Sequence, residues 1–324
     1  MSVQAILKVE DLTKHFALGR SMLSSGDVIK AVDGVSFSLM QGETLSLVGE
    51  SGCGKSTIGR LVLRLIPPTR GAVFYQDQDI GQLPPERMRK LRSEMQIIFQ
   101  DPWSSLNPRM TVKEIIGEGL RRETGLSSSE RKKRILRMME TVGLRPEHYD
   151  RHPHEFSGGQ RQRLGIARAL IMRPKLVVAD EPLSALDVSV QAQVVNLLAR
   201  LKRDLGLSYL FISHDLAVVE HISDRIAVMY LGKLMELASK HQLFSQPRHP
   251  YTQALFSAAP TTEVGREKKR ILLSGDVPSP LNPPSGCRLH TRCPQAQEDC
   301  RRLEPEFKLL SPGHWVACHH PLAS

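Results

Sequence analysis

The residues with the clearest chemical use form a glycine-rich run, Gly49-Glu-Ser-Gly-Cys-Gly-Lys-Ser-Thr57. It fits the pattern G-x-x-x-x-G-K-[ST], in which backbone amides curl around phosphates and the lysine reaches the terminal ones. An apolar run, Thr44–Val48, precedes it and a helical pattern begins at Lys55, which is the strand–loop–helix order that the motif requires. The run predicts a nucleotide-phosphate site, but alone it does not separate a kinase or GTPase from a transport ATPase. The expected phosphate contacts are Gly49, Glu50, Ser51, Gly52, Cys53, Gly54, Lys55, Ser56 and Thr57.

A second candidate site is a pair of acids at the end of the apolar run Leu176-Val-Val-Ala-Asp-Glu181. Asp180 is placed to hold Mg²⁺, directly or through water, and Glu181 is placed to polarise an attacking water. An ordinary strand end could carry the same two acids without any chemistry. The phosphate loop elsewhere in the chain favours the functional interpretation.

The most specific run is Phe156-Ser-Gly-Gly-Gln-Arg-Gln-Arg163. Ser157 and Gln160 make a capping box for a helix that we expect to continue through Leu170. Gly158 and Gly159 beside that helix N-terminus leave its backbone donors open to an anion. Helix capping alone accounts for Ser157 but not for Ser-Gly-Gly-Gln as a unit.

With these motifs in this order, nearly the whole chain resembles the ATP-binding subunits of ABC transporters, with Phe156 in place of the usual leucine. The resemblance implies that Phe16 stacks on adenine, although unaided we would read it as a core residue. Gln100 would contact Mg²⁺ or the water and sense the permease, Asp187 in Ser184-Ala-Leu-Asp187 would link two ATPase halves, and His214 would contact the γ-phosphate.

The resemblance also implies a mechanism. ATP would lie between one subunit's phosphate loop and the Ser157–Gln160 signature of a second subunit, with Glu181, Gln100 and His214 as catalytic residues. Mg²⁺ would be held by Ser56, Gln100 and Asp180.

Two further runs are similar to the ATP-binding subunits of bacterial dipeptide and oligopeptide importers, and most of all to the second ATPase of a dipeptide importer. These are Asn107 after Gln100-Asp-Pro-Trp-Ser-Ser-Leu, and Pro247-Arg-His-Pro-Tyr-Thr-Gln-Ala-Leu255. The resemblance implies a peripheral subunit at the cytoplasmic face of the bacterial inner membrane. Its partners would be a sister ATPase in a heterodimer, two integral-membrane permeases and a periplasmic peptide-binding protein. Cargo stays open, because relatives also move nickel, glutathione, haem or antimicrobial peptides.

Four cysteines are crowded near the C-terminus, with the spacing Cys287-x5-Cys293-x6-Cys300-x17-Cys318. This spacing does not match paired C-x-x-C zinc knuckles. Four thiols in a loop-rich segment could hold a [4Fe–4S] cluster, as in some similar importer ATPases, or a zinc ion, or stay unligated. Cys53 lies inside the phosphate loop, and we interpret it as structural.

The elements expected to position these residues alternate between strands and helices. Met95–Phe99, Leu176–Ala179 and Tyr209–Ser213 read as buried strands, like Thr44–Val48. Amphipathic stripes predict helices, one over about 127–142 and one through Val190, Val194, Leu197 and Leu201. This predicts an α/β fold: an ABC-type P-loop ATPase with a RecA-like core, an antiparallel β subdomain and a helical signature subdomain. Domains are expected at 1–275, with the helical subdomain at about 103–155, and at 276–324 for a small loop-rich extension.

Composition narrows the class further. The net charge of +10 is scattered, and aromatic residues make up only 5% of the chain, so we expect no nucleic-acid partner. No apolar run approaches a membrane span and the start lacks a secretory layout, so we expect other chains to supply the membrane path. Two alternatives remain: a soluble ABC ATPase acting on ribosomes or DNA, and an ATP-gated regulatory module. The second is disfavoured by Asp180, Glu181 and His214.

Overall fold

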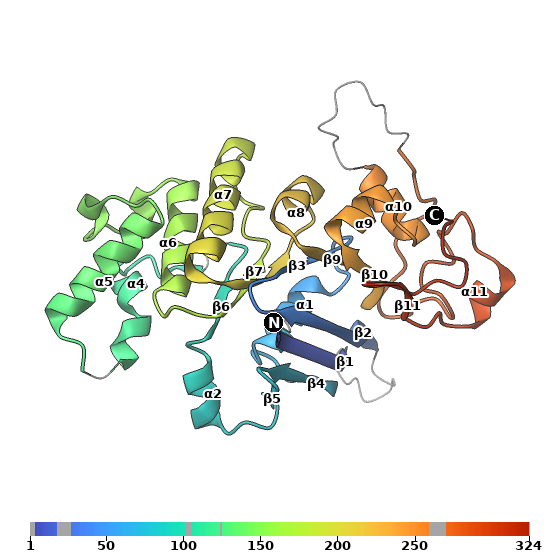
Figure 1. Cartoon of the computed structure of the whole chain (residues 1–324), viewed down its shortest axis with the longest axis horizontal. Helices are drawn as coiled ribbons and strands as arrows, with labels where there is room; N and C mark the ends of the chain where they lie inside the picture. Colours follow the sequence, from blue (N-terminus) through green and yellow to red (C-terminus); the bar gives the residue numbers. More distant parts are fainter. Residues whose placement is uncertain (1–3, 18–26, 102–104, 124, 259–269, 324) are drawn as a thin grey trace. The chain divides into compact units, whose positions relative to one another are not determined.

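The computed structural model describes residues 4–17, 27–101, 105–123, 125–258 and 270–323 (Figure 1). The chain divides into two compact units: one contains residues 1–82 with 213–324, and the other contains residues 83–212. The expected boundary at residue 276 lies within the first unit, and Trp103, the expected start of the helical subdomain, lies outside the described residues.

The first unit contains an antiparallel sheet in the order β2-β1-β4-β5 (Figure 1). Its strands are β1 (Ala5–Ala17), β2 (Val28–Met40), β4 (Arg70–Tyr75) and β5 (Gln78–Asp79). Leu7, Val9 and Leu12 of β1 are buried while Lys8 and Asp11 are exposed, so one face of the strand points into the core. This sheet carries Phe16 near the end of β1.

A second group of strands in the same unit has the order β11-β12-β10-β9-β3. Strand β3 (Thr44–Val48) is parallel to β9 (Arg225–Tyr230), whereas β10 (Lys233–Ser239), β12 (His314–Val316) and β11 (Lys308–Ser311) continue antiparallel. The C-terminal strands therefore extend the sheet that contains the strand leading into the phosphate loop. Around it lie α1 (Lys55–Val62), α8 (Leu216–Ile222), α9 (Lys240–Ser245), α10 (Pro250–Ser257) and α11 (Glu298–Arg302).

One hydrophobic core joins β3, β9 and β10 to the helices α8, α9 and α10 and to the C-terminal region. Val48 of β3, Tyr230 of β9 and Tyr251 of α10 pack in the same cluster as Cys287 and Cys300 of the C-terminal region. Large buried aromatic side chains supply much of the apolar area that such a core removes from water. The region after residue 276 is thus anchored on the core beneath the phosphate loop.

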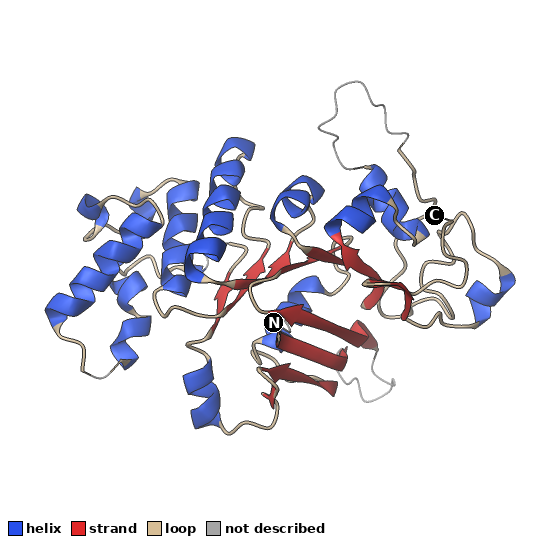
Figure 2. Cartoon of the chain, viewed as in Figure 1, coloured by secondary structure: helices blue, strands red, loops and turns tan. Residues whose placement is uncertain are grey.

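The second unit contains parallel strands in the order β6-β7-β8, formed by β6 (Met95–Ile98), β7 (Leu176–Asp180) and β8 (Ser208–Ile212). Helices dominate the rest of this unit (Figure 2). They are α2 (Pro85–Leu91), α4 (Val112–Gly117), α5 (Ser128–Thr141), α6 (Gly158–Leu170) and α7 (Val188–Leu205), with 3-10 turns η1 (Gly119–Arg122), η2 (Pro146–His148) and η3 (Pro153–Glu155).

Local sequence signals account for these helices. A capping box of Ser127 and Glu130 opens α5 within the range expected for a helix, and its apolar residues Ile135 and Met139 are buried. The stripe of α7 buries Val194, Leu197 and Leu201. Within the part of the chain that the structure describes, we find no helix of the length and apolar character that a bilayer crossing needs.

Candidate functional site

The phosphate loop connects β3 to α1 as predicted, and its glycines are required by close backbone approaches. Gly49 has φ of 148°, and a Cβ there would lie 2.2 Å from the carbonyl oxygen of Met229. Gly54 has φ of 108°, and a Cβ there would lie 2.1 Å from the carbonyl oxygen of Ala31. Any side chain would push the loop away from the strands beneath it.

Lys55 folds back across this loop. Its ammonium donates to the carbonyl oxygens of Gly49 at 2.8 Å and Glu50 at 3.1 Å, and its side chain is buried. Cys53 is also buried, its sulfur 3.7 Å from the Lys55 ammonium. Burial raises the pKa of the Cys53 thiol despite the neighbouring ammonium, and this supports a structural interpretation of that cysteine.

Sequence reasoning missed the residues that hold the loop from outside. The Glu50 backbone N–H donates to the Tyr251 hydroxyl at 2.9 Å, and the Glu50 carboxylate accepts from Arg292 at 2.8 Å. Tyr251 lies inside the tract Pro247–Leu255 that the family resemblance singled out without a role. Arg292 precedes Cys293 and carried no signal of its own.

The predicted acids lie together with the predicted glutamine in the second unit. Asp180 ends β7 with 5% of its surface exposed, and Glu181 follows with φ of 44°. The Glu181 backbone N–H donates to the carbonyl oxygen of Ile212 at 3.0 Å. Gln100 donates its Nε2 hydrogen to Glu181 Oε2 at 2.9 Å. A left-handed backbone at a non-glycine residue is a strained conformation typical of functional sites.

The signature run begins α6 with the predicted capping box. The Ser157 backbone N–H donates to Gln160 Oε1 at 3.0 Å, and the Gln160 backbone N–H donates to the Ser157 hydroxyl at 3.4 Å. A Cβ on Gly159 would lie 2.5 Å from a methyl group of Val190 in α7. A Cβ on Gly158 would lie 3.5 Å from Leu186. Glycine at 159 is therefore what lets the signature approach the first turn of α7, which follows Asp187.

Asp187 is exposed at the N-cap position of α7. The turn before it is held by Gln191, whose Nε2 donates to the carbonyl oxygens of Leu183 at 3.1 Å and Leu186 at 3.0 Å. Ser184 donates its hydroxyl to the carbonyl oxygen of Glu181 at 3.1 Å. The predicted linking segment and the predicted base thus share one hydrogen-bonded turn.

The remaining predicted residues lie in the first unit. Phe16 is 38% exposed, with the Lys14 ammonium 5.1 Å from its ring centre, so the core interpretation from residue type alone was wrong. His214 is also exposed, and Ser56 and Thr57 at the start of α1 are partly buried. The first unit therefore carries Phe16, the phosphate loop and His214, and the second carries the acids, Gln100 and the signature.

The four C-terminal cysteines line one small cavity of about 10 Å³ with His249, His290, His319 and His320. All four are free thiols, and the backbone N–H of Cys287 donates to the carbonyl oxygen of Cys300 at 2.8 Å. Burial raises the pKa of Cys287 to about 11 and that of Cys318 to about 12, because a buried thiolate lacks hydration. Four soft donors around one cavity fit the chemistry of a thiolate-bound metal centre.

Beside the cysteines, Asp299, Cys300 and His320 place ligand atoms within 4.8 Å of one another. The His320 Nε2 already lies 3.0 Å from both oxygens of Asp299. This imidazole–carboxylate pair can orient the helix that carries Cys300.

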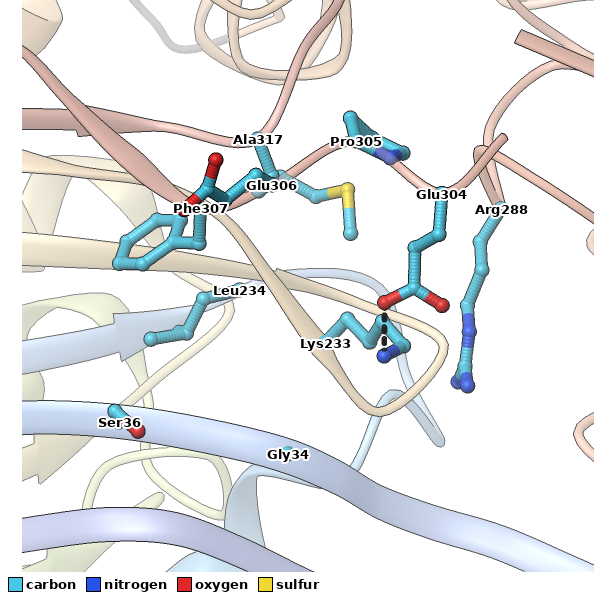
Figure 3. Close-up of a pocket in the computed structure, with 11 residues that line it drawn as sticks. Gly34, Ser36, Lys233, Leu234, Arg288, Glu304, Pro305, Glu306, Phe307 and Ala317 are labelled. Carbon is cyan, nitrogen blue, oxygen red and sulfur yellow. Dashed lines mark hydrogen bonds and ion pairs between the residues drawn. The ribbon is translucent and has the colours of Figure 1, made fainter.

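Another cavity, of about 280 Å³, lies between β2 and the C-terminal region (Figure 3). Figure 3 shows the Glu304 carboxylate beside the Lys233 ammonium at the cavity wall, and these two side chains form an ion pair. The Arg288 side chain pairs with Asp33. The charges around this cavity are thus largely paired with one another, and they fasten the C-terminal region to the β subdomain.

Comparison with known proteins decides the family. The ABC transporter family model matches residues 32–184, and the model of the oligopeptide/dipeptide transporter C-terminal region matches residues 235–300. The oligopeptide transport ATP-binding protein AppF of Bacillus subtilis is 54% identical over 98% of this chain and 97% of its own length. The chain belongs to the ABC-transporter ATP-binding family.

Another relative of this ABC protein is the dipeptide transport ATP-binding protein DppF of Escherichia coli, 52% identical over 97% of this chain and 94% of its own. A solved ATP-binding cassette, described as a dimer in a post-hydrolysis state bound to ADP and Pi, superimposes with a TM-score of 0.65 and 28% identity. It covers 72% of this chain and 98% of its own length. The predicted ABC-type α/β fold is confirmed.

Proposed function

We propose that this ABC protein hydrolyses ATP to energise the import of dipeptides or oligopeptides across the bacterial inner membrane. The observation that carries the proposal is the presence, in one chain, of the phosphate loop, the acidic strand end and a C-terminal region of the oligopeptide/dipeptide transporter type. The names of the relatives AppF and DppF, an oligopeptide and a dipeptide transport ATP-binding protein, support the choice of cargo class.

In this proposal the phosphate loop wraps the ATP phosphates and Phe16 stacks on adenine. Lys55 swings from its two backbone carbonyls to the terminal phosphates, since an ammonium can exchange carbonyl partners for a stronger anionic one. Mg²⁺ would be held by Ser56, Gln100 and Asp180, and it would neutralise the charge that develops on the phosphoryl group. Asp180 is buried at a strand end and Gln100 bonds the adjacent Glu181, which supports this ligand set.

The chemistry we assign to the chain's own residues is water activation and charge stabilisation. Glu181 would accept the proton of the attacking water, Gln100 would orient the Glu181 carboxylate, and His214 would contact the γ-phosphate. The open N-terminus of α6, with Ser157, Gly158, Gly159 and Gln160, would face the ATP of a partner ATPase, and Asp187 would contact that partner. We place the ATP-binding domain at 1–275, its helical subdomain at about 103–155, and the extension at 276–324.

The proposed assembly has a sister ATPase, two permeases and a periplasmic peptide-binding protein, with this chain at the cytoplasmic face. Affinity purification of the tagged chain from its host's membranes in mild detergent tests it. Recovery of multi-span permeases and a second ATPase supports the heteromeric importer, and a permease with this chain alone favours a homodimer. Recovery of only ribosomal or DNA-bound partners would overturn transport while leaving the ATPase chemistry in place.

For the cysteines we propose a thiolate-bound metal centre, and we favour a [4Fe–4S] cluster because the spacing lacks paired zinc knuckles. All four thiols line the same cavity, which supports a shared set of ligands. Metal and sulfide analysis of anaerobically purified protein is the test. Iron with inorganic sulfide supports the cluster, zinc alone replaces it by the single ion, and background amounts of all three refute a metal centre.

A further inference from the structure

Glu50 is the only acidic residue in the phosphate loop 49–57, and the protein holds it at three points. Its backbone N–H donates to Tyr251 at 2.9 Å, and its carbonyl oxygen accepts from the Lys55 ammonium at 3.1 Å and from the Cys53 backbone N–H at 3.3 Å. Its carboxylate oxygens accept from Arg292 Nη1 at 2.8 and 3.1 Å. Two of these partners, Tyr251 and Arg292, come from the last third of the chain, and neither belongs to the nucleotide-binding motifs.

Arg292 is itself held in place for this contact. Its side chain is only 9% exposed, and its Nη1 also lies 3.2 Å from the Tyr230 hydroxyl. Its guanidinium carbon is 5.8 Å from the centre of the Tyr230 ring, and that ring packs on Tyr251 with 4.8 Å between centroids. The Arg292 backbone N–H donates to the carbonyl oxygen of Leu289 at 2.8 Å. A guanidinium fixed on both sides keeps little freedom to lose when it binds a carboxylate.

The contact has an electrostatic consequence. A phosphate loop binds a highly charged anion, and a carboxylate inside it opposes that binding by like-charge repulsion. The Glu50 side chain is 29% exposed, so water screens only part of its charge. Pairing with a nearly buried guanidinium cancels the charge and holds the carboxylate on the side of the loop that faces the C-terminal region.

We propose that Arg292 is a positioning residue of the nucleotide site: it neutralises and holds Glu50 so that the loop accepts phosphate. The proposal rests on the assignment of this loop to ATP. It makes the region after residue 276 a working part of the ATP site and gives the tract 247–255 a role through Tyr251, which holds the same residue by its backbone.

The alternative is that Arg292 only anchors the C-terminal region to the domain. Charge rescue separates the two. If Arg292 acts by cancelling the Glu50 charge, Arg292→Ala weakens ATP binding, and adding Glu50→Gln restores it because the loop is neutral again. If Arg292 only anchors the tail, neutralising Glu50 restores nothing, since the tail still lacks its contact.

The experiment measures affinity for MgATP by calorimetry with the full-length chain, and KM and kcat for hydrolysis. We expect Arg292→Ala to raise Kd and KM about ten-fold with kcat changed less than two-fold, the pattern of lost ground-state binding. Arg292→Lys, which keeps the charge, should stay within about three-fold of the wild type. Arg302→Ala is the matched control. In the described part of the chain, the one ion pair of Arg302 is with exposed Glu298 of the same helix α11, at 2.7 Å.

Each outcome decides something. An Arg292→Ala protein that binds ATP as tightly as Arg302→Ala, or a weakened one that Glu50→Gln does not rescue, overturns the inference while the ATP site stands. A wild-type chain that binds no ATP, with no change on Lys55→Ala, refutes the proposed function instead. Should Arg292→Ala fail to fold, Arg292→Gln, which keeps a donor for Glu50 but no charge, takes its place in the same rescue.

Discussion

Replacing Glu181 by glutamine tests the catalytic assignment most directly, because the change removes the basic carboxylate and its negative charge while keeping the length and shape of the side chain. The two side chains have the same shape, and glutamine tolerates the φ of 44° at this position as well as glutamate does. Gln100, whose Nε2 lies 2.9 Å from Glu181 Oε2, can still donate to an amide oxygen, in a weaker neutral hydrogen bond. The partly buried turn should therefore keep its structure, with a stability change below about 1 kcal/mol.

The expected kinetic effect is much larger than the effect on stability. A positioned general base typically contributes between 10²- and 10⁴-fold, so kcat should fall about 10³-fold, or about 4 kcal/mol in activation free energy. Affinity for ATP should change less than three-fold, because the water, not the nucleotide, loses its partner. With hydrolysis blocked, ATP should also hold the chain in a dimer with its co-purified sister ATPase, which size-exclusion chromatography detects.

The measurements are phosphate release, MgATP calorimetry and chromatography with and without ATP. Glu86→Gln is the control, an exposed glutamate in the first turn of α2 outside every motif. Phosphate release within three-fold of the wild type would refute Glu181 as the base. An equal loss of ATP binding would show instead that the substitution had damaged the site.

Two further predictions concern the first unit. Gly49→Ala should abolish measurable ATP binding and lower the free energy of unfolding by about 1–3 kcal/mol, since the new Cβ would lie 2.2 Å from a backbone carbonyl oxygen. The control is Gly165→Ala in α6, where the new Cβ has space around it. This variant should lose neither stability nor ATP binding in the same melting and binding assays. Burial lowers the pKa of His249 to about 4. Between this value and the usual histidine pKa of about 6.5, the unfolded chain binds a proton at His249 that the folded chain does not. The free energy of unfolding should therefore fall by up to about 3 kcal/mol as the pH drops from about 6.5 to 4. His249→Asn keeps an acceptor for the start of α10 and should flatten that part of the pH profile of urea midpoints, whereas an unchanged slope would contradict the assignment to His249.

Much of the fold could be predicted because its signals are local. The apolar run Thr44–Val48 became β3 with the predicted bounds, and the capping box at Ser127 opened a helix one residue later. The capping box at Ser157 likewise opened α6, which ends at Leu170 as predicted. Caps and hydrophobic periods act over three or four residues, so one sequence contains all the information they need. The roles assigned to Glu181, Gln100 and His214 stay predictions, although Gln100 and Glu181 do lie in contact.

The sequence indicated the close approach of Gly159 in the signature to Val190 at the start of α7 only in part. Two glycines after Ser157 were interpreted as leaving helix donors open, which needs no neighbour at all. In the structure, the absence of a side chain at Gly159 also makes room for a methyl group of Val190, thirty-one positions along the chain. A pattern that allows both explanations cannot by itself distinguish an anion site from a close approach of two helix ends.

The contact between Arg292 and Glu50 had no local signal, because it joins residues 242 positions apart. An arginine next to a cysteine indicates no particular contact, and an acidic residue at a variable position of the phosphate-loop pattern indicates no partner. The pairing depends on β10 and β12 extending the sheet that contains β3, and on a shared core that brings Tyr230, Tyr251 and the cysteine loops beneath the phosphate loop. In that topology Glu50 has Arg292 as its partner, and this ion pair connects the C-terminal region to the phosphate loop. The negative charge that Glu50 adds to the phosphate loop is then neutralised by Arg292, which only the folding of the chain brings close to it.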